Sequence, residues 1–215
     1  MPQTFEPAAE LVVKLVLVAI LGLGVVAIVV VMGDRDARDP IGVYAAQPVP
    51  FSHKHHVGDI GLDCRFCHPT SETAATPGMP SAALCLGCHS QLFSDQAVFR
   101  PLRESLASGR PVLWTRLNHL PDYVYFDHHV HVARGVACME CHGRVDQMAL
   151  MQRPQRMTMR WCIACHEHPE DRIGQPTDVF RMPAPVRDAR NAQNVAALAR
   201  LEPLQRRVDC SSCHR

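Results

Sequence analysis

The hydrophobic pattern begins with one long apolar run near the N-terminus. Residues 11–32 read LVVKLVLVAILGLGVVAIVVVM, and the stretch from Leu15 to Met32 includes no charged or hydrogen-bonding side chain. At about 1.5 Å per residue, a helix over this segment is roughly 33 Å long, which is enough to cross a bilayer. The pattern predicts a transmembrane anchor helix over residues 11–32, preceded by a short polar tail over residues 1–10.

A cleaved signal peptide is the alternative explanation of this run. Its apolar region is usually about 7–15 residues long and ends at a small-x-small cleavage site. The run here is longer, and no A-x-A site follows Met32. We therefore favour an uncleaved anchor.

The pattern changes after the apolar run. Residues 33–50 hold two glycines and three prolines and are predicted to form an extended linker. Near the C-terminus, residues 187–207 are rich in arginine and favour a helix that is interrupted by Pro203.

Composition excludes some functions and points to cysteine and histidine chemistry. The formal net charge of +1 argues against a nucleic-acid-binding protein and against a polybasic membrane-surface protein. Aromatic residues make up 6% of the chain, whereas 10 cysteines and 13 histidines are present. An ordinary aromatic-rich core is not expected from this composition.

Every cysteine falls in a C-x-x-C pair, and a histidine follows each pair directly. Independent chance would place five histidines there roughly once in 10⁶ trials, so the pattern matches the C-x-x-C-H signature of haem c attachment. The pairs and their histidines are Cys64, Cys67 and His68; Cys85, Cys88 and His89; Cys138, Cys141 and His142; Cys162, Cys165 and His166; and Cys210, Cys213 and His214.

The spacing fits the chemistry of haem c better than that of other cysteine sites. Two thiols three positions apart bond the two vinyl groups of one haem, and the adjacent histidine binds its iron. Zinc needs two converging C-x-x-C pairs or later histidines at finger spacing, and a thioredoxin-type pair occurs once, in a βαβ context. We therefore expect five covalent haem c groups.

The haem motifs are arranged as an internal repeat. F-x-H-x-x-H followed by G-[LV]-x-C-x-x-C-H begins at Phe51 and again at Phe126, and a second C-x-x-C-H motif follows each, at Cys85 and at Cys162. This predicts a pentahaem domain over 51–215, with two-haem modules at 51–90 and 126–167 and a fifth haem at 208–215. The expected fold is a multihaem cytochrome c, mostly irregular, with short α-helices around packed haems and one N-terminal transmembrane helix.

Eight histidines remain as candidate second axial ligands. The two F-x-H-x-x-H segments supply His53, His56, His128 and His131, and His119 is the fifth candidate. Residues three apart on a helix share one face, so each segment is suited to serve two haems. Met159 is the favoured methionine ligand, although methionines often only fill gaps around a ring. His55, His129 and His168 are less favoured, and Met79, Met148, Met151 and Met157 are further alternatives.

If all five irons have two axial ligands, no position is open for a substrate. The sequence therefore favours an electron relay without a catalytic site of its own. Haem c is attached outside the cytoplasm, which predicts a single-pass protein of the inner membrane with its haem domain on the periplasmic side. Arg35 and Arg38, set against Lys14, lean weakly the other way under the positive-inside rule, and we give the haem argument precedence.

The combination of anchor and motifs resembles a known family. The class III multihaem cytochromes share the F-x-H-x-x-H and C-x-x-C-H elements, and the whole arrangement looks like the pentahaem cytochrome c subunit of alternative complex III. The matching strings are FSHKHHVGDIGLDCRFCH, TPGMPSAALCLGCHS, NHLPDYVYFDHHVHVARGVACMECHGRVDQM, MRWCIACH and CSSCHR.

This resemblance implies a place in a respiratory or photosynthetic quinol-oxidising complex. The implied partners are an iron–sulfur subunit, multispanning membrane subunits with quinol sites, and a monohaem cytochrome c. The chain would carry electrons from the iron–sulfur clusters to a cytochrome c or another periplasmic acceptor.

Two other functions compete with this one. A stand-alone membrane-anchored quinol dehydrogenase usually has four haems and a first motif close to its helix, whereas about 30 residues separate Met32 from Cys64 here. A multihaem reductase would need an iron without a second axial ligand.

Overall fold

The computed structural model of the chain describes residues 6–38, 40–183 and 208–214. The chain divides into two units, Met1–Pro40 and Ile41–Arg215, and each is described by itself. The arginine-rich helix predicted over residues 187–207 lies outside the described residues.

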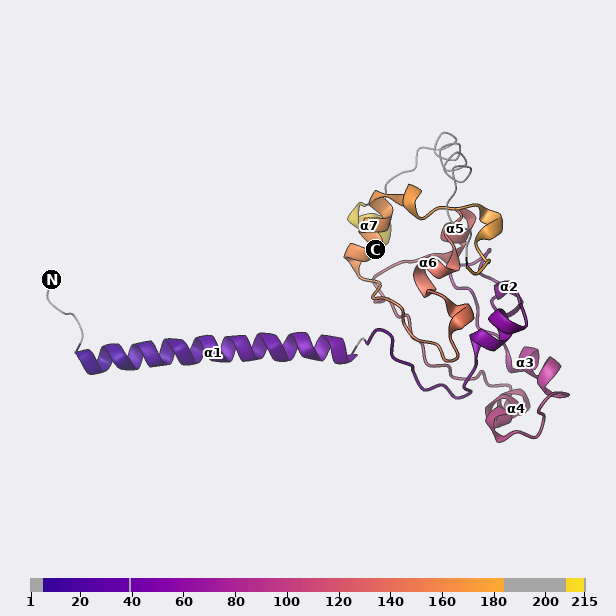
Figure 1. Cartoon of the computed structure of the whole chain (residues 1–215), viewed down its shortest axis with the longest axis horizontal. Helices are drawn as coiled ribbons and strands as arrows, with labels where there is room; N and C mark the ends of the chain where they lie inside the picture. The colour runs from indigo at the N-terminus through magenta and orange to yellow at the C-terminus, as the bar shows by residue number, and fades with distance from the viewer. Residues whose placement is uncertain (1–5, 39, 184–207, 215) are drawn as a thin grey trace. The chain divides into compact units, whose positions relative to one another are not determined.

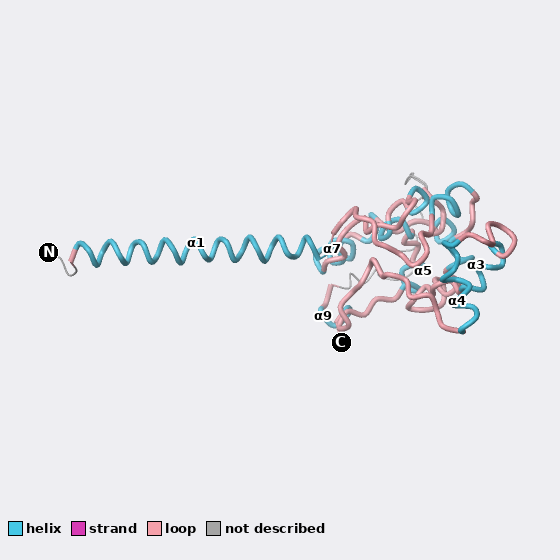
Figure 2. The backbone as a smooth tube through the Cα atoms, turned by 90° about the horizontal axis from the view of Figure 1, so that it is seen from below, coloured by secondary structure: helices cyan, strands magenta, loops and turns pink. Residues whose placement is uncertain are grey.

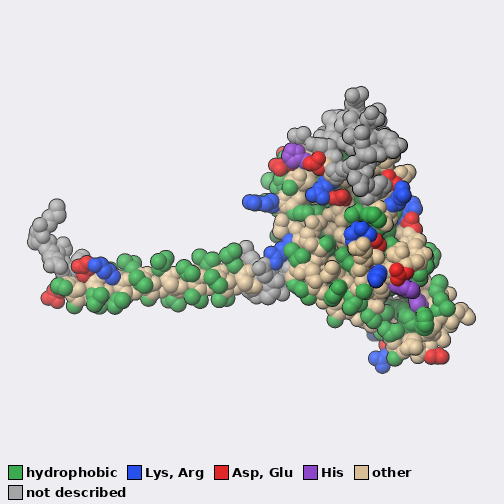
Figure 3. All heavy atoms as spheres, viewed as in Figure 1, with side chains coloured by type: hydrophobic (Ala, Val, Ile, Leu, Met, Phe, Trp, Pro, Cys, Tyr) green, Lys and Arg blue, Asp and Glu red, His purple; other side chains and the backbone are tan. Residues whose placement is uncertain are grey.

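The first unit contains one long helix, α1 (Pro7–Arg38), of 32 residues (Figure 1). Its stretch from Pro7 to Gly33 is long and apolar enough to cross a membrane, and its most apolar window has no buried residue. Figure 3 shows hydrophobic side chains along the drawn face of this helix. An unburied apolar helix of this length is typical of a segment that is surrounded by lipid.

The helix extends beyond both ends of the predicted anchor segment. Pro7 is its first residue, a position that suits proline because the first N–H groups of a helix have no partner within it. Lys14 Nζ donates to Glu10 Oε1 at 2.5 Å across one turn. At the other end, residues 34–38 contain no helix-breaking residue, and Pro40 disfavours helical backbone at the residue before it. The predicted linker over 33–50 is therefore helical in its first part.

The second unit consists of short helices and irregular segments (Figures 1 and 2). No strand occurs among the described residues, where β-structure is limited to isolated bridges such as Tyr44 with Gln152. Its α-helices are α2 (Cys64–Cys67), α3 (Ala82–His89), α4 (Arg100–Ser108), α5 (His128–Ala133), α6 (Cys138–His142), α7 (Met159–Glu167) and α9 (Cys210–Cys213). One π-helical segment, η1 (Lys54–Asp59), follows His53. The 3₁₀ turns are η2 (Ala97–Phe99), η3 (Val145–Gln147), η4 (Pro169–Asp171) and η5 (Pro176–Asp178).

Several of the short helices begin at a capping side chain. Ser81 Oγ accepts a hydrogen bond from the backbone N–H of Leu84 at the start of α3. Thr158 Oγ1 does the same for Trp161 at the start of α7. Asp63 Oδ1 accepts from the N–H of Arg65 at the start of α2. These caps satisfy backbone donors that a short helix leaves unpaired, so each stabilises a helix that carries a haem motif.

The polypeptide supplies only a small apolar core of its own. Its main cluster consists of Val49, Ala82 and Leu102, packed against side chains that include Phe99 and Trp114. Among the described residues, the other buried hydrophobic side chains are Ala137, Val145, Met148, Ile173 and Val179. A domain of this length ordinarily buries more, so the short helices and loops have the organisation expected of a chain that surrounds prosthetic groups.

Candidate haem-binding sites

Each C-x-x-C-H segment lies in or at the end of a short helix. The five segments occupy α2, α3, α6, α7 and α9. Positions i and i+3 of a helix share a face, so the two thiols of each pair point to the same side, as the attachment of one porphyrin requires. No disulfide joins any two of the ten cysteines.

The F-x-H-x-x-H segment of the first module holds its two histidines against one phenylalanine. The ring of His53 meets Phe51 edge-on, with centroids 4.8 Å apart and planes at 88°. The ring of His56 stacks on Phe51 at 4.3 Å and 26°. His56 Nδ1 lies 2.8 Å from the backbone oxygen of Ser52. Phe51 therefore fixes the orientation of both imidazoles.

The second F-x-H-x-x-H segment has nearly the same geometry. His128 meets Phe126 edge-on at 4.8 Å and 89°, and His131 stacks on Phe126 at 4.4 Å and 30°. His131 Nδ1 lies 2.7 Å from the backbone oxygen of Asp127. The glycines before the two cysteine motifs, Gly61 and Gly135, both have φ of +80°. Sequence similarity and local structure thus agree between the two segments.

Three of the candidate axial histidines face the histidine of a C-x-x-C-H motif. His56 and His89 have ring centroids 6.1 Å apart, with planes at 61°. His131 and His166 repeat this arrangement at 6.2 Å and 58°. The His128 and His142 rings are 6.3 Å apart and nearly parallel, at 8°.

These separations are the ones that an iron atom between two imidazoles requires. An imidazole nitrogen binds a metal at about 2.0 Å and lies about 1.1 Å from its ring centroid, so two rings on opposite sides of one iron have centroids about 6.2 Å apart. Rings in direct stacking contact are closer than this, as His56 and Phe51 show at 4.3 Å. The three histidine pairs therefore fit a six-coordinate haem iron.

Hydrogen bonds at Nδ1 leave the other ring nitrogen of these histidines available for a metal. When Nδ1–H donates to a carbonyl oxygen, Nε2 keeps its lone pair, which is the usual arrangement of a metal-binding histidine. The backbone oxygens that accept from Nδ1 belong to Ser52 for His56, Gly78 for His68, Leu92 for His89, Ala75 for His128, Asp127 for His131 and Tyr123 for His214.

His53 is the fourth candidate axial ligand. Burial, and then the neighbouring His68, His56 and His142, lower the pKa of His53 to about 4. His53 corresponds to His128 in the repeat, and His68 corresponds to His142. The neutral, half-buried ring next to His68 is suited to bind the iron of the first motif, and this pairing stays a prediction.

The fifth motif has different surroundings. Val124 pairs with His214 in an isolated bridge, and the N–H of Tyr125 donates to the carbonyl of Cys213 at 2.8 Å. The ring of Tyr123 lies 5.7 Å from that of His214, with planes at 30°. Residues 123–125, which lead into α5, thus hold the last motif in place.

The structure does not bring His119 or Met159 opposite a motif histidine. His119 is exposed and makes no ring contact with another histidine in the described part of the chain. Met159 is the first residue of α7 and is 67% exposed. The assignment of either residue as an axial ligand stays a prediction.

The cysteine side chains of different motifs lie close together. Those of Cys64 and Cys138 are neighbours. Both also contact one short segment, since the Cys64 thiol faces the carbonyl of Phe180 at 3.7 Å and the N–H of Cys138 donates to Val179 at 3.1 Å. The first and third motifs are therefore neighbours in space, although the whole stretch 69–137 lies between them in the sequence.

Other contacts bring the remaining motifs together. The side chain of Gln155 donates to the backbone oxygen of Glu140 in α6 at 2.9 Å and accepts from Trp161 in α7 at 3.0 Å, so it joins the third and fourth motifs. Cys165 of the fourth motif is near Cys141 of the third, and Cys213 of the fifth motif is near Cys162 of the fourth.

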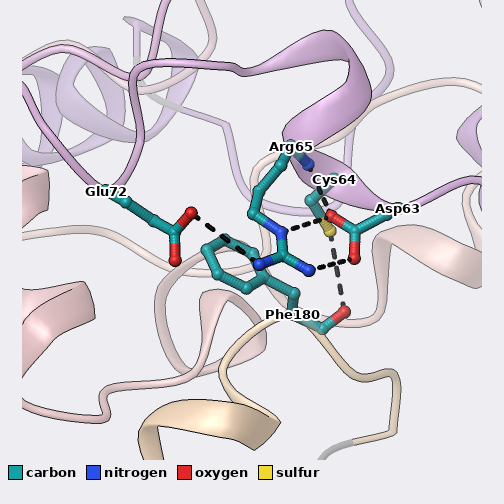
Figure 4. Close-up of polar contacts among 5 residues, drawn as sticks. All are labelled: Asp63, Cys64, Arg65, Glu72 and Phe180. Carbon is teal, nitrogen blue, oxygen red and sulfur yellow. Dashed lines mark hydrogen bonds and ion pairs between the residues drawn. The ribbon is translucent and has the colours of Figure 1, made fainter.

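An arginine inside the first motif is held by protein groups (Figure 4). The Arg65 guanidinium donates twice to Asp63, at 2.9 Å each, and lies 3.7 Å from Glu72. It also lies over the ring of Phe180, 4.6 Å from the centroid. Arg65 therefore joins α2 to the segment around Phe180.

Several of these site features could not be predicted from the sequence. The acceptors for the histidine Nδ1 atoms are backbone oxygens, among them those of Ala75 and Gly78, and a carbonyl group carries no sequence signal. Ala75 lies 53 residues before His128, whose ring it orients. The repeat predicts which histidines face inward, whereas the partners come from the tertiary fold.

Comparisons with known proteins agree with this geometry. Residues 124–215 match the family model described as cytochrome c7 and related cytochrome c. A segment of 97 residues is 41% identical to the multiheme cytochrome c subunit of menaquinone reductase from Nitratidesulfovibrio vulgaris, strain Hildenborough. The aligned segment covers 45% of this chain and 45% of that relative, so the chain spans less than half the length of the relative it matches.

The family match and the cysteine–histidine motifs together imply covalently bound haem c. They also confirm the predicted fold class, because the described chain is helical and irregular and carries one apolar N-terminal helix. Residues 124–215 therefore form a cytochrome c7-like multihaem segment, in a chain related to a multihaem cytochrome subunit of menaquinone reductase.

Proposed function

We propose that the chain is a membrane-anchored pentahaem electron relay in a complex that exchanges electrons with the quinone pool. The observation that carries this proposal is the set of three histidine pairs with ring centroids 6.1, 6.2 and 6.3 Å apart. Each pair has the separation of two axial ligands on one iron. Haem iron with two such ligands supplies one-electron transfer and has no open position for a substrate.

The order of the motifs in space supports a relay. In the first module His53 and His56 lie one turn apart, near His68 and His89 respectively, and so join the first and second motifs. The Cys64–Cys138 contact joins the first motif to the third.

The other half of the chain continues the same row. His128 and His131 face the histidines of the third and fourth motifs, and Cys162 lies near Cys213 of the fifth. We infer from these neighbours the order second, first, third, fourth, fifth. The second and fifth motifs are the ends of this row, where exchange with other proteins is expected.

The partners and the direction of electron flow follow from the family resemblance. The proposed complex contains an iron–sulfur subunit, multispanning subunits with quinol sites and a monohaem cytochrome c, and α1 holds the chain in the inner membrane with its haem domain in the periplasm. Quinol oxidation is the proposed direction. The relative is named for menaquinone reduction, so the opposite direction is the second candidate.

The test uses the complex purified from membranes through a tag on the full chain. We expect an iron–sulfur protein and polytopic subunits to co-purify, and quinol to reduce the haems only in the complex. Reduction by a low-potential cytochrome, with quinone as the final acceptor, would support the second direction. Recovery of this chain alone with full quinol-oxidising activity would contradict the relay proposal.

A further inference from the structure

Asn118 contacts the histidine of the third motif. Its amide Nδ2 lies 3.1 Å from Nδ1 of His142. Its Oδ1 is buried and has no hydrogen-bond partner among the described residues. The guanidinium of Arg153 donates to the carbonyl of the preceding residue, Leu117, at 2.8 Å and so fixes this part of the chain next to the motif.

The two observations at Asn118 have one explanation. Nε2 of a metal-binding histidine carries the lone pair that binds the metal, so Nδ1 carries the proton and is a donor. An amide nitrogen next to that donor would put two N–H groups against each other. The oxygen and nitrogen of an asparagine amide have nearly the same shape and can be exchanged by a half-turn. After this turn Oδ1 accepts from His142 Nδ1, and the buried oxygen has its partner.

This contact differs from those of the other histidines described above. His68, His128 and His131 each donate Nδ1–H to a backbone oxygen. The partner of His142 is a side chain, which a single substitution can alter without changing the backbone. His142 also belongs to the motif in the middle of the row, beside both the first and the fourth.

We propose that Asn118 is a positioning residue that orients His142 and sets the reduction potential of the haem at the third motif. A stronger acceptor at Nδ1 makes the imidazole a better electron donor to iron, and this stabilises the ferric state. When Nδ1 has no hydrogen-bond acceptor, the imidazole is a weaker electron donor and the ferric state is less stable. The inference rests on the proposed attachment of haem at this motif.

The test compares Asn118→Asp and Asn118→Leu with a matched control in the full, membrane-extracted chain. Gln47→Glu is the control, since it also turns an amide into a carboxylate. Within the described part of the chain, the Gln47 amide bonds only to the backbone of Thr115. Haem content is measured first, and the midpoints are then followed by potentiometric titration with electron paramagnetic resonance (EPR) detection.

Asn118→Asp is expected to raise the ferric-to-ferrous ratio of one haem about tenfold at fixed potential, a 59 mV decrease in its midpoint for one electron. Asn118→Leu is expected to shift the same haem in the opposite direction, and Gln47→Glu to shift none. Opposite shifts would not follow from a merely structural role. Should Asn118→Leu lose haem, the comparison of Asn118→Asp with Gln47→Glu decides alone.

Two failures are distinguishable. Unchanged midpoints in Asn118→Asp with full haem content would overturn the role of Asn118 and leave the relay intact. A wild-type chain without haem at the third motif would overturn the proposed function itself.

Discussion

Removal of the His128 ring tests the pairing of axial ligands most specifically. The ring of His128 lies 6.3 Å from that of His142, and its only other aromatic contact among the described residues is the edge of Phe126 at 4.8 Å. In His128→Ala, the iron between the two imidazoles loses one axial ligand and becomes high-spin. We expect one fifth of the low-spin haem signal to be converted to high-spin. The free energy of unfolding should also fall by about 0.5–1.5 kcal/mol through loss of the aromatic contact with Phe126.

The geometry also predicts which spectral signal disappears. Two axial rings with planes at 8° interact with the same iron d orbital and separate its energy from that of a second d orbital. Strongly inclined rings interact with both orbitals, so the energy separation is smaller. His128→Ala should therefore remove a rhombic low-spin EPR signal. His131→Ala, whose ring is at 58° to that of His166, should remove a more anisotropic signal.

The control is His129→Ala, because His129 is the exposed neighbour of His128 in α5. We expect it to keep every low-spin haem. The pairing would be refuted if His128→Ala kept the complete low-spin spectrum with full haem content, or if His129→Ala gave the same high-spin signal.

Three further predictions concern the fold around the sites. Gly61→Ala and Gly135→Ala both place a side chain at φ of +80°, at a cost of about 1–2 kcal/mol each. A Cβ at Gly135 would also collide with the carbonyl oxygen of Gly174, so thermal unfolding should show the larger loss of stability for Gly135→Ala. Equal losses would contradict the close approach of the two backbones. Thr158→Ala removes the cap of α7 and should lower the free energy of unfolding by about 1 kcal/mol in chemical denaturation, as should Ser81→Ala at α3, and no change would contradict the caps. Arg144, paired with Asp146 at 2.6 Å, holds the pKa of the Asp146 carboxyl below its usual value. This pair therefore stabilises the fold above about pH 4, and the stabilisation is lost as the pH falls through the lowered pKa. The thermal unfolding of Asp146→Asn should depend less on acid pH than that of the wild type, and identical profiles would contradict this.

The sequence is sufficient to predict the chemistry and the fold class, because both depend on local spacing. A C-x-x-C-H motif is a short contiguous segment, and a transmembrane run is recognised from its own composition. The ends of α1 are harder to predict, since residues 34–38 are mostly charged and yet continue the helix to Arg38. Helix continuation there depends on the absence of a breaking residue and not on hydrophobic pattern.

The partners of each histidine require the structure. The repeat at Phe51 and Phe126 predicts two inward-facing imidazoles per module, and the phenylalanine rings hold them in that way. Which motif each ring faces depends on the path of the intervening chain. The contact of His142 with Asn118 is also tertiary, because 24 residues separate them.

The central claim is that every cysteine pair carries a covalent haem. The most direct measurement is the intact mass of the full chain, followed by mapping of the modified peptides. The account predicts the polypeptide mass plus five haem groups, with one haem on each of the five cysteine-pair peptides. A chain that carried fewer haems after native maturation, or whose cysteines were joined as disulfides, would contradict it.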